Sequence, residues 1–261
     1  MAGELIVKRD GHAGWIVFSN VAKHNAVSLD MWRALPAAVR ALDDDRNVRL
    51  IVVAGDGDKA FISGADISEF TSQRGDEVAR DEYNAAVDVG YRTLAATLTP
   101  TLAAIRGICF GGGIGLALAC DLRLASDDSR FCLPAARLGL GYSYAGIRRL
   151  VDVVGPAYAA EIMATARTFT AGEALQMRLV NRVAPAASLD ALVAETIGQV
   201  AANAPLTVRA AMKAIDEGLK PSPERDLAAV QAMVDACFAS DDYKEGRRAF
   251  MEKRKPDFRG R

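Results

Sequence analysis

Short apolar runs alternate with amphipathic stretches from the N-terminus to about residue 185. Residues 5–9 and 15–19 are β-rich and are separated by glycines, which is typical of a hairpin. The continuous apolar run over residues 50–54 (LIVVA) predicts a strand that is covered on both faces. Further short strands are predicted over residues 101–106, 122–125, 130–133 and 180–184.

Between these strands, apolar residues recur at helical spacing. One helix face, preceded by a capping Ser28, is predicted to carry Trp32, Leu35, Val39 and Leu42. A polar helix with one apolar stripe is expected over residues 77–98, and a buried apolar helix over residues 114–120. Thr170 and Glu173 have the spacing of a capping box, so a short helix is expected to begin there.

From Ser188 onward the pattern is helical, with breaks at residues 203–205 and 221–223. The chain therefore divides into a core over residues 1–187, in which strands and helices alternate, and a helical region over residues 188–261. Alternation of this kind predicts α/β layers with parallel strand pairing.

The composition narrows the class of protein. The 261 residues are 51% hydrophobic and 25% charged, and 32 Lys and Arg against 33 Asp and Glu leave a net charge of −1. A nucleic-acid-binding protein usually carries a basic excess. No apolar stretch approaches the ~20 residues of a membrane helix, and the first ten residues lack the apolar segment of a signal peptide. We therefore expect a cytoplasmic protein without a nucleic-acid or membrane partner.

The sequence lacks the residues that metal sites, dinucleotide-binding sites and hydrolase triads require. The four cysteines have no CxxC spacing and are expected to be buried free thiols, and His12 and His24 are expected to be surface or packing residues. No metal site is therefore predicted. Leu116 stands where a dinucleotide-binding GxGxxG beginning at Gly111 needs glycine. No histidine follows Ser143, so the hydrolase triad suggested by residues 141–145 is excluded.

Two glycine-bordered loops carry the remaining chemistry. Residues 61–67 form a loop that enters a helix, with Gly64 just before Ala65, and residues 111–113 form a glycine run that opens the predicted apolar helix. Helix N-termini expose unpaired N–H groups with a partial positive charge, and glycine allows a ligand oxygen to approach them closely. One N–H from each loop, converging on one oxygen, would form an oxyanion hole.

At these residues the sequence resembles the crotonase superfamily of enoyl-CoA hydratases and isomerases. Residues 60–67 (AFISGADI) are similar to the family's F-x-x-G-A-D-I segment, and residues 105–121 to its glycine-rich segment. Residues 170–183 are similar to its A-x-x-A-x-x-x-G-L-V region, with Arg178 where glycine is usual, and residues 242–258 to its C-terminal tail. The resemblance covers nearly the whole chain.

The resemblance implies a fold and a substrate. The fold would be a crotonase-like spiral of ββα units, with residues 188–261 used in assembly of a homotrimer or hexamer. The substrate would be an acyl-CoA thioester, whose enolate is stabilised by the N–H groups of Ala65 and Gly112; coenzyme A enters as part of the substrate, and no other cofactor is implied. The residues implied in substrate and CoA binding are Ala65, Asp66, Ile67, Ser68, Gly112, Phe250 and Lys253.

The departure from the family concerns its two catalytic glutamates. The first falls two residues after the glycine triplet, where this chain has Gly115, and the second follows a proline, where this chain has Ala135 after Pro134. Neither residue can act as a general acid or base. The backbone oxyanion hole does not depend on these side chains.

Tyr142 is the implied polar replacement, because the methylmalonyl-CoA decarboxylase branch has tyrosine in a similar L-G-x-x-Y-x-x-x-G-I stretch. That branch carries histidine at the position of Ala65, so the match is partial. The dehalogenase branch is disfavoured because its nucleophilic aspartate matches Ser143. Three hypotheses remain: an enoyl-CoA hydratase-type lyase or isomerase, a malonyl- or methylmalonyl-type CoA decarboxylase, and a non-catalytic acyl-CoA-binding protein.

Overall fold

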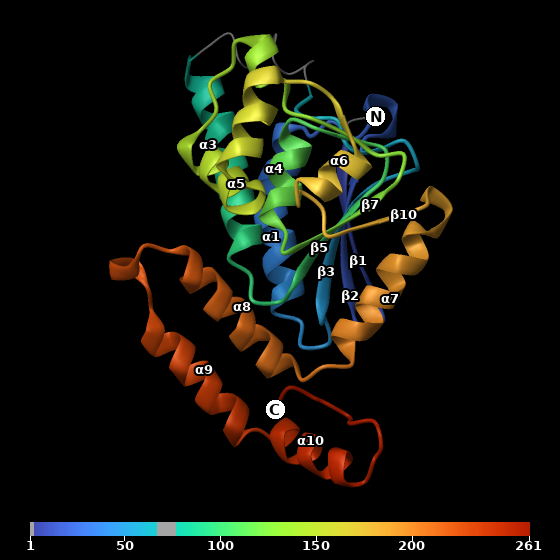
Figure 1. The fold of residues 1–261 in the computed structure, drawn as a ribbon, viewed down its shortest axis with the longest axis vertical. Coiled ribbons are helices and arrows are strands. Elements are labelled where there is room, and N and C mark those ends of the chain that lie inside the picture. The colour runs from blue at the N-terminus through green and yellow to red at the C-terminus, as the bar shows by residue number, and fades with distance from the viewer. Residues whose placement is uncertain (1–2, 67–76) are drawn as a thin grey trace.

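The computed structural model describes residues 3–66 and 77–261, which form two sheets surrounded by helices (Figure 1). The larger sheet has the order β1-β2-β3-β5-β7-β10 and consists of Glu4–Asp10 (β1), Ala13–Ser19 (β2), Leu50–Gly55 (β3), Thr101–Ile105 (β5), Leu122–Ser126 (β7) and Arg182–Ala184 (β10). The smaller sheet has the order β4-β6-β8-β9 and consists of Ala60–Ile62 (β4), Ile108–Phe110 (β6), Arg130–Cys132 (β8) and Phe169–Thr170 (β9).

The strand pairing gives the spiral. β1 and β2 form the predicted antiparallel hairpin, and every other neighbouring pair in the larger sheet is parallel. In the smaller sheet β4, β6 and β8 are parallel, and β9 is antiparallel to β8. Each of β3, β5 and β7 is followed by a strand of the smaller sheet, so the chain winds through successive two-strand units. The predicted spiral of ββα units is confirmed.

Helices cover both faces of the larger sheet. The α-helices of the described residues are Leu29–Asp43 (α1), Glu77–Ala95 (α3), Gly112–Ala119 (α4), Tyr144–Thr165 (α5), Ala171–Gln176 (α6), Leu189–Ala201 (α7), Pro205–Leu219 (α8), Leu227–Ala239 (α9) and Asp241–Met251 (α10). In Figure 1, α1, α3, α4 and α5 lie on one side of the larger sheet and α7 on the other. Since both faces are covered, the continuous apolar strand pattern is explained.

Alternate residues of β3 enter two separate cores. Ile51 and Val53 pack with the residues of α1 and α4, whereas Leu50 and Val52 pack with Leu189 and its neighbours on α7. All four β3 side chains are fully buried. Burying a side chain of this size contributes roughly 1.5–3 kcal/mol relative to leaving it exposed. The first helix after residue 187 therefore packs on the sheet of the preceding region.

Several local predictions are confirmed. The Ser28 hydroxyl accepts a hydrogen bond from the Met31 N–H at 3.3 Å, and Thr170 with Glu173 forms a complete capping box. Cys109, Cys120 and Cys132 are buried, all four cysteines are free, and both histidines are exposed. Arg178 has a φ of 61°, the left-handed region that favours glycine, which explains why glycine is usual at this position.

Other predictions are wrong at the boundaries. The segment expected to be a loop from residue 61 begins with β4, and β6 was not predicted. The helix expected to reach residue 98 ends at Ala95. Thr99 precedes Pro100, which disfavours helical backbone there, and it donates its N–H and its hydroxyl to Asp43 at 3.0 and 2.7 Å.

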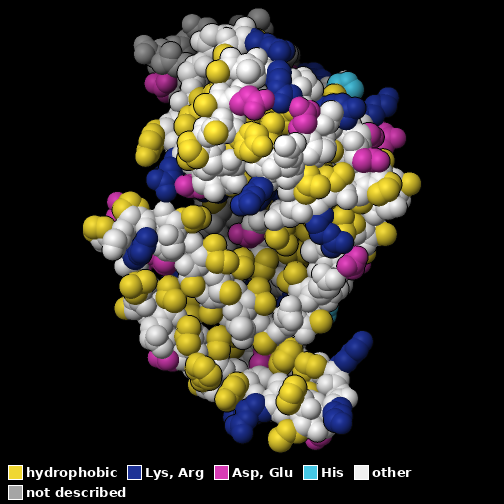
Figure 2. Space-filling view, viewed as in Figure 1, with side chains coloured by type: hydrophobic (Ala, Val, Ile, Leu, Met, Phe, Trp, Pro, Cys, Tyr) yellow, Lys and Arg dark blue, Asp and Glu magenta, His cyan; other side chains and the backbone are white. Residues whose placement is uncertain are grey.

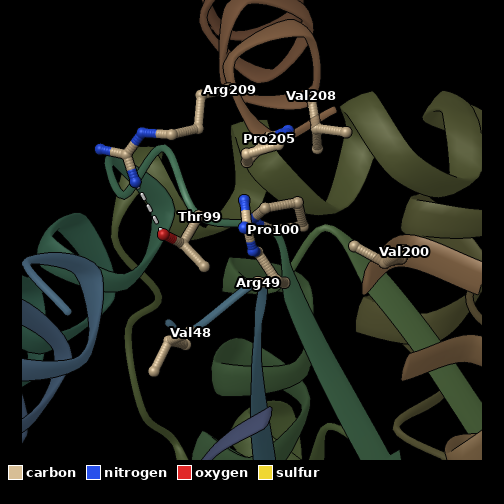
Figure 3. A pocket seen from close by; sticks show the side chains of 8 residues that line it. All are labelled: Val48, Arg49, Thr99, Pro100, Val200, Pro205, Val208 and Arg209. Atoms are coloured by element: carbon tan, nitrogen blue, oxygen red, sulfur yellow. Dashed lines mark hydrogen bonds between the residues drawn. The ribbon is translucent and has the colours of Figure 1, made fainter. Parts of the chain in front are cut away.

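A small cavity lies where α8 meets the amino ends of β3 and β5 (Figure 3). Its volume is about 20 Å³, enough for a single water molecule. The Arg209 guanidinium donates to the Thr99 hydroxyl and to the Asp43 carboxylate, both at 2.8 Å, and so joins α8 to the core. This cavity is too small for an organic ligand and lies at the edge of the sheet opposite the glycine-rich loops.

The last three helices extend away from the sheets (Figure 1). α9 is mostly apolar, yet none of its residues is buried. Figure 2 shows many hydrophobic side chains at the surface of this half of the molecule. Over the described residues, the structure contains no helix that combines the length and apolar character needed to span a membrane.

Candidate functional site

The two glycine-bordered loops leave the carboxyl ends of neighbouring parallel strands. β4 leads to Gly64 and Ala65, and β6 leads to Gly111 and Gly112. A Cβ atom at Gly111 would lie 3.8 Å from the Cα atom of Gly64. A Cβ atom at Gly113 would lie 2.5 Å from the carbonyl oxygen of Ile62, so glycine is what allows α4 to pack directly on β4. The structure therefore brings the two loops together.

One backbone N–H in each loop is available to a ligand. Gly112 is the first residue of α4, after Gly111 in the N-cap position. Ala65 forms a parallel bridge with Val27, in which the Val27 N–H donates to Gly64 and the Asp66 N–H donates to Val27. The Ala65 N–H is left outside this bridge. Within residues 3–66 and 77–261, neither the Ala65 N–H nor the Gly112 N–H has a protein acceptor.

The predicted CoA-binding residues fall into three groups. The carboxylate of Asp66 is mostly buried and accepts from the Lys23 ammonium at 2.7 and 3.0 Å. Ile67 and Ser68 lie outside the described residues. Phe250 is 86% exposed on α10, and Lys253 follows that helix. In Figure 1, α10 is far from α4 along the long axis, so a single chain does not bring Phe250 and Lys253 to the loops.

The positions of the two missing carboxylates differ in their surroundings. Ala135 is buried in the short 3-10 helix Pro134–Leu138, which follows β8. Gly115 lies in the first half of α4 and faces Tyr91 of α3. A Cβ atom at Gly115 would lie 2.7 Å from the Tyr91 ring carbon Cζ and closer still to its hydroxyl oxygen. The Tyr91 side chain thus fills the space that a side chain at position 115 would need.

Tyr91 is held by α4 and by Trp32. Its hydroxyl donates to the Gly112 carbonyl oxygen at 2.9 Å, and its ring packs edge-on against Trp32 with the ring centroids 5.1 Å apart. The Trp32 indole N–H donates to the Tyr83 hydroxyl at 3.1 Å, which in turn donates to the Val27 carbonyl at 3.3 Å. Tyr83, Trp32 and Tyr91 therefore form a chain of contacts. It links Val27, the bridge partner of Ala65, to Gly112 at the start of α4.

Sequence reasoning missed Tyr91, although a signal was present. Tyr91 is four residues after Val87 and three before Leu94, so the three residues share one face of the helix predicted over residues 77–98. The stripe places Tyr91 on the buried face. That the face lies against Gly115 follows from the packing of α3 on α4.

Tyr142 lies just before α5, with its ring against Gly146. Burial raises the pKa of Tyr142 to about 12. Burial also raises the pKa of Tyr91 well above its usual range, and the neighbouring Tyr142 contributes to this shift. Both hydroxyls are therefore protonated at neutral pH and suited to donate rather than to act as bases. The Ser143 hydroxyl is engaged as the cap of α5, accepting from the Gly146 N–H at 3.2 Å.

Comparison with known proteins shows the family of the chain. Residues 12–261 match the family described as Enoyl-CoA hydratase/isomerase. The chain is 33% identical over 254 residues to the crotonyl-CoA hydratase of Syntrophomonas wolfei, with 97% of each chain covered. It is 36% identical over 261 residues to a probable enoyl-CoA hydratase of Rhizobium meliloti, with 98% of each chain covered.

Solved structures agree along the whole length. An enoyl-CoA hydratase/carnithine racemase from Magnetospirillum magneticum superposes with a TM-score of 0.92 at 35% identity, covering 98% of this chain and 96% of that one. A putative enoyl-CoA hydratase/isomerase family protein from Hyphomonas neptunium gives 0.92 at 33% identity, with 98% of both chains covered. The helices after residue 187 are therefore part of the shared architecture.

Proposed function

The chain belongs to the enoyl-CoA hydratase/isomerase family, and from this premise we propose that it binds an acyl-CoA thioester with the carbonyl oxygen between the N–H groups of Ala65 and Gly112. The observation that carries the proposal is that these two N–H groups, on adjacent loops, have no acceptor within the described part of the chain. Removing one such donor in known enzymes costs about 2.7–4 kcal/mol of transition-state stabilisation. Enolate stabilisation is therefore the chemistry proposed for this site.

The reaction proposed is one that begins without a base. Gly115 and Ala135 have no proton-transferring group, and Tyr142 remains protonated at neutral pH because its pKa is about 12. In decarboxylation of a malonyl- or methylmalonyl-type thioester, the bond to the carboxylate carbon breaks and its electron pair forms the enolate as CO₂ leaves. Tyr142 would orient the departing carboxylate through its hydroxyl.

Hydration is the second candidate, supported by the similarity to the crotonyl-CoA hydratase of Syntrophomonas wolfei. Hydration requires a group that takes a proton from water, a role worth ~10²–10⁴-fold in rate. Neither Tyr142 nor the residues at positions 115 and 135 would fill this role at neutral pH. Isomerisation of an enoyl-CoA and acyl-CoA binding without turnover complete the set of alternatives.

The test is product analysis on three thioesters. Purified protein is incubated with methylmalonyl-CoA, malonyl-CoA and crotonyl-CoA, and CO₂ release, double-bond migration and hydration are followed by mass spectrometry and absorbance. Release of CO₂ with little hydration is the expected result. Efficient hydration of crotonyl-CoA contradicts the decarboxylase proposal, and binding of all three without turnover contradicts catalysis.

The helices from residue 188 onward are proposed to assemble the chain into a trimer or a hexamer. Leu227 is 64% exposed and Phe238 is 61% exposed on α9, a helix without a buried residue in the single chain. Phe250 and Lys253 would then contact CoA by reaching the loops of a neighbouring copy. Ala65, Asp66, Ile67 and Ser68 would line the pantetheine and adenine within one copy.

A further inference from the structure

The Tyr91 hydroxyl lies next to two positions of the proposed site, Gly112 and Gly115. Its hydroxyl oxygen lies 3.5 Å from the position of a Cβ atom on Gly112, the residue whose N–H would bind the thioester oxygen. The same hydroxyl lies against Gly115, where the family carries a glutamate. A polar group from another helix therefore occupies the place from which the missing side chain of α4 would extend.

We propose that Tyr91 is a catalytic residue that donates its hydroxyl proton to the α-carbon of the thioester enolate. This inference rests on the proposed function, because it requires an enolate held at Ala65 and Gly112. The α-carbon is bonded directly to the carbonyl carbon. The proposal places this carbon beside the Tyr91 hydroxyl, which donates to the carbonyl oxygen of the same Gly112 at 2.9 Å.

The surroundings hold the hydroxyl in place. The Gly112 carbonyl accepts its proton at 2.9 Å, and the edge-on contact with Trp32 fixes the ring. Rotation about the bond between Cζ and the hydroxyl oxygen turns the proton from the Gly112 carbonyl towards a substrate without moving the ring. Such preorganised donors need little reorganisation at the moment of reaction.

The proton transfer balances with water as the co-reactant. The O–H bond of Tyr91 breaks, and the enolate electron pair forms the new C–H bond at the α-carbon. The resulting tyrosinate takes a proton back from water, so CO₂ is replaced by a solvent proton over one decarboxylation cycle. Burial raises the pKa of Tyr91 well above its usual range, which keeps the donor protonated before each cycle.

The assignment divides the work between two tyrosines. Tyr142, next to Gly146 and close to Tyr91, would orient the carboxylate that leaves. Tyr91 would protonate the carbon from which it has left. Under this assignment Tyr91 alone determines which face of the enolate receives the proton. Tyr91→Phe should therefore change the configuration of the product at the α-carbon, whereas Tyr142→Phe should not.

The experiment follows the solvent-derived hydrogen. The full chain and its Tyr91→Phe variant turn over methylmalonyl-CoA and crotonyl-CoA in D₂O, and the configuration of the deuterium at the α-carbon of each product is determined by NMR. Tyr91→Phe keeps the ring against Trp32 and removes only the hydroxyl. Gly115→Ala is a second variant, whose methyl group displaces the hydroxyl without deleting it. Tyr83→Phe is the matched control, because it removes a buried hydroxyl from the same cluster.

We expect one deuterated isomer from the unmodified chain and from Tyr83→Phe, and both isomers from Tyr91→Phe and Gly115→Ala. Turnover by Tyr91→Phe should fall by about 10²-fold or more. A single isomer from Tyr91→Phe overturns the inference even if its rate falls, since a merely structural residue would not change the proton source.

Binding of acetoacetyl-CoA separates the two proposals. Its enolate forms by loss of an α-proton to the solvent and has a distinct ultraviolet absorbance, which an oxyanion hole strengthens by stabilising the enolate without a proton from Tyr91. If the unmodified chain shows the enolate band and Tyr91→Phe still gives one isomer, the inference about Tyr91 alone is wrong. If the unmodified chain shows neither the band nor turnover, the proposed function fails, and the inference about Tyr91 falls with it.

Discussion

The side chain of Tyr91 on α3 occupies the space beside Gly115 on α4, with its Cζ atom 2.7 Å from where a Cβ atom of residue 115 would lie. The two positions are therefore linked: a side chain at 115 can be accommodated only if the Tyr91 ring shifts or a smaller residue replaces it. The space next to position 115, where the family has a carboxylate, is therefore not empty, because the Tyr91 side chain of α3 fills it.

Restoring the family's carboxylates is expected to require a change at Tyr91. The unmodified chain should hydrate crotonyl-CoA weakly, and Gly115→Glu with Ala135→Glu should give little improvement because the new side chain at 115 collides with the tyrosine. Adding Tyr91→Ala makes room for it, and hydration should then rise by up to ~10²-fold. Steady-state hydration rates of the three proteins test this. A large gain in the double variant that still has Tyr91 would contradict the steric explanation.

Gly112 offers a matched pair of substitutions. It is the first residue of α4, a position that tolerates proline, so Gly112→Pro removes the N–H with little expected damage to the helix. Gly112→Ala keeps the N–H, and its methyl group would make ordinary contacts at 3.5 Å with Tyr91 and 3.7 Å with Trp32. Turnover should fall by ~10²–10³-fold in the proline variant and much less in the alanine variant. Equal turnover in the two variants would sink the oxyanion assignment.

Titration of Tyr142 should not contribute to the pH dependence of turnover between pH 6 and 10. Since its pKa is about 12, the hydroxyl remains protonated at every pH between 6 and 10. Loss of its proton therefore cannot produce a fall in turnover within that window. Tyr142→Phe should lower turnover by a similar factor at each pH, as measured by kcat across the range. A factor that vanishes towards pH 10 would show that Tyr142 titrates there.

Much of the fold was predictable because burial leaves a pattern. The apolar run of β3 and the spacing of Trp32, Leu35 and Val39 report which faces are covered. β4 and β6 were missed because each has three residues and merges into a glycine-bordered loop, too short for any period to show. These strands nevertheless place the two loops side by side.

The candidate site was predictable only where its chemistry is in the backbone. Glycines before a helix indicate exposed N–H groups and pointed to the two loops. The assignment to Ala65 and Gly112 followed from the resemblance to the crotonase superfamily and stays a prediction. Tyr91 could not be named from the sequence, because its relationship to Gly115 depends on how α3 packs against α4, and no local pattern records a contact 24 residues apart. The absence of a glutamate at 115 was visible in the sequence, but the occupation of that space by the Tyr91 side chain was not.

The Glu217 carboxylate, at the connection between α8 and α9, is expected to stabilise the fold in a pH-dependent way. Its buried carboxylate accepts from Lys213 at 2.6 Å, from Lys220 at 2.8 Å and from the Asp226 N–H at 2.8 Å, which lowers its pKa to about 2. A carboxyl whose pKa is lowered on folding stabilises the protein above its unfolded pKa of ~4.3 and loses that contribution as the pH falls towards the folded value.

Glu217→Gln should therefore lower the thermal unfolding midpoint at pH 7, and the difference from the unmodified chain should shrink between pH 4.5 and pH 2.5. Glu224→Gln, at an exposed position in the following turn, serves as the control and should change the midpoint little at either pH. Unfolding followed by circular dichroism at several pH values checks this. A difference that stays constant down to pH 2.5 would show that the Glu217 charge is not the cause.

Oligomer formation is expected to depend on α9. This helix carries Leu227 and Phe238, each more than half exposed, and none of its residues is buried in the single chain. Exposed apolar surface of this extent usually marks an interface. Light scattering of the unmodified protein should give a multiple of 27.8 kDa that corresponds to a trimer or a hexamer. Leu227→Glu combined with Phe238→Asp should shift that mass towards the monomer.

Val7→Glu is the matched control, because Val7 is a 43% exposed apolar residue on β1 rather than on α9, and it should leave the mass unchanged. If Phe250 and Lys253 contact CoA from a neighbouring copy, the monomeric variant should also bind acyl-CoA more weakly, although it retains the Ala65 and Gly112 loops. A monomeric unmodified chain would contradict the assembly. A monomeric variant that binds acyl-CoA as tightly as the unmodified oligomer would instead show that α10 contributes nothing to the site.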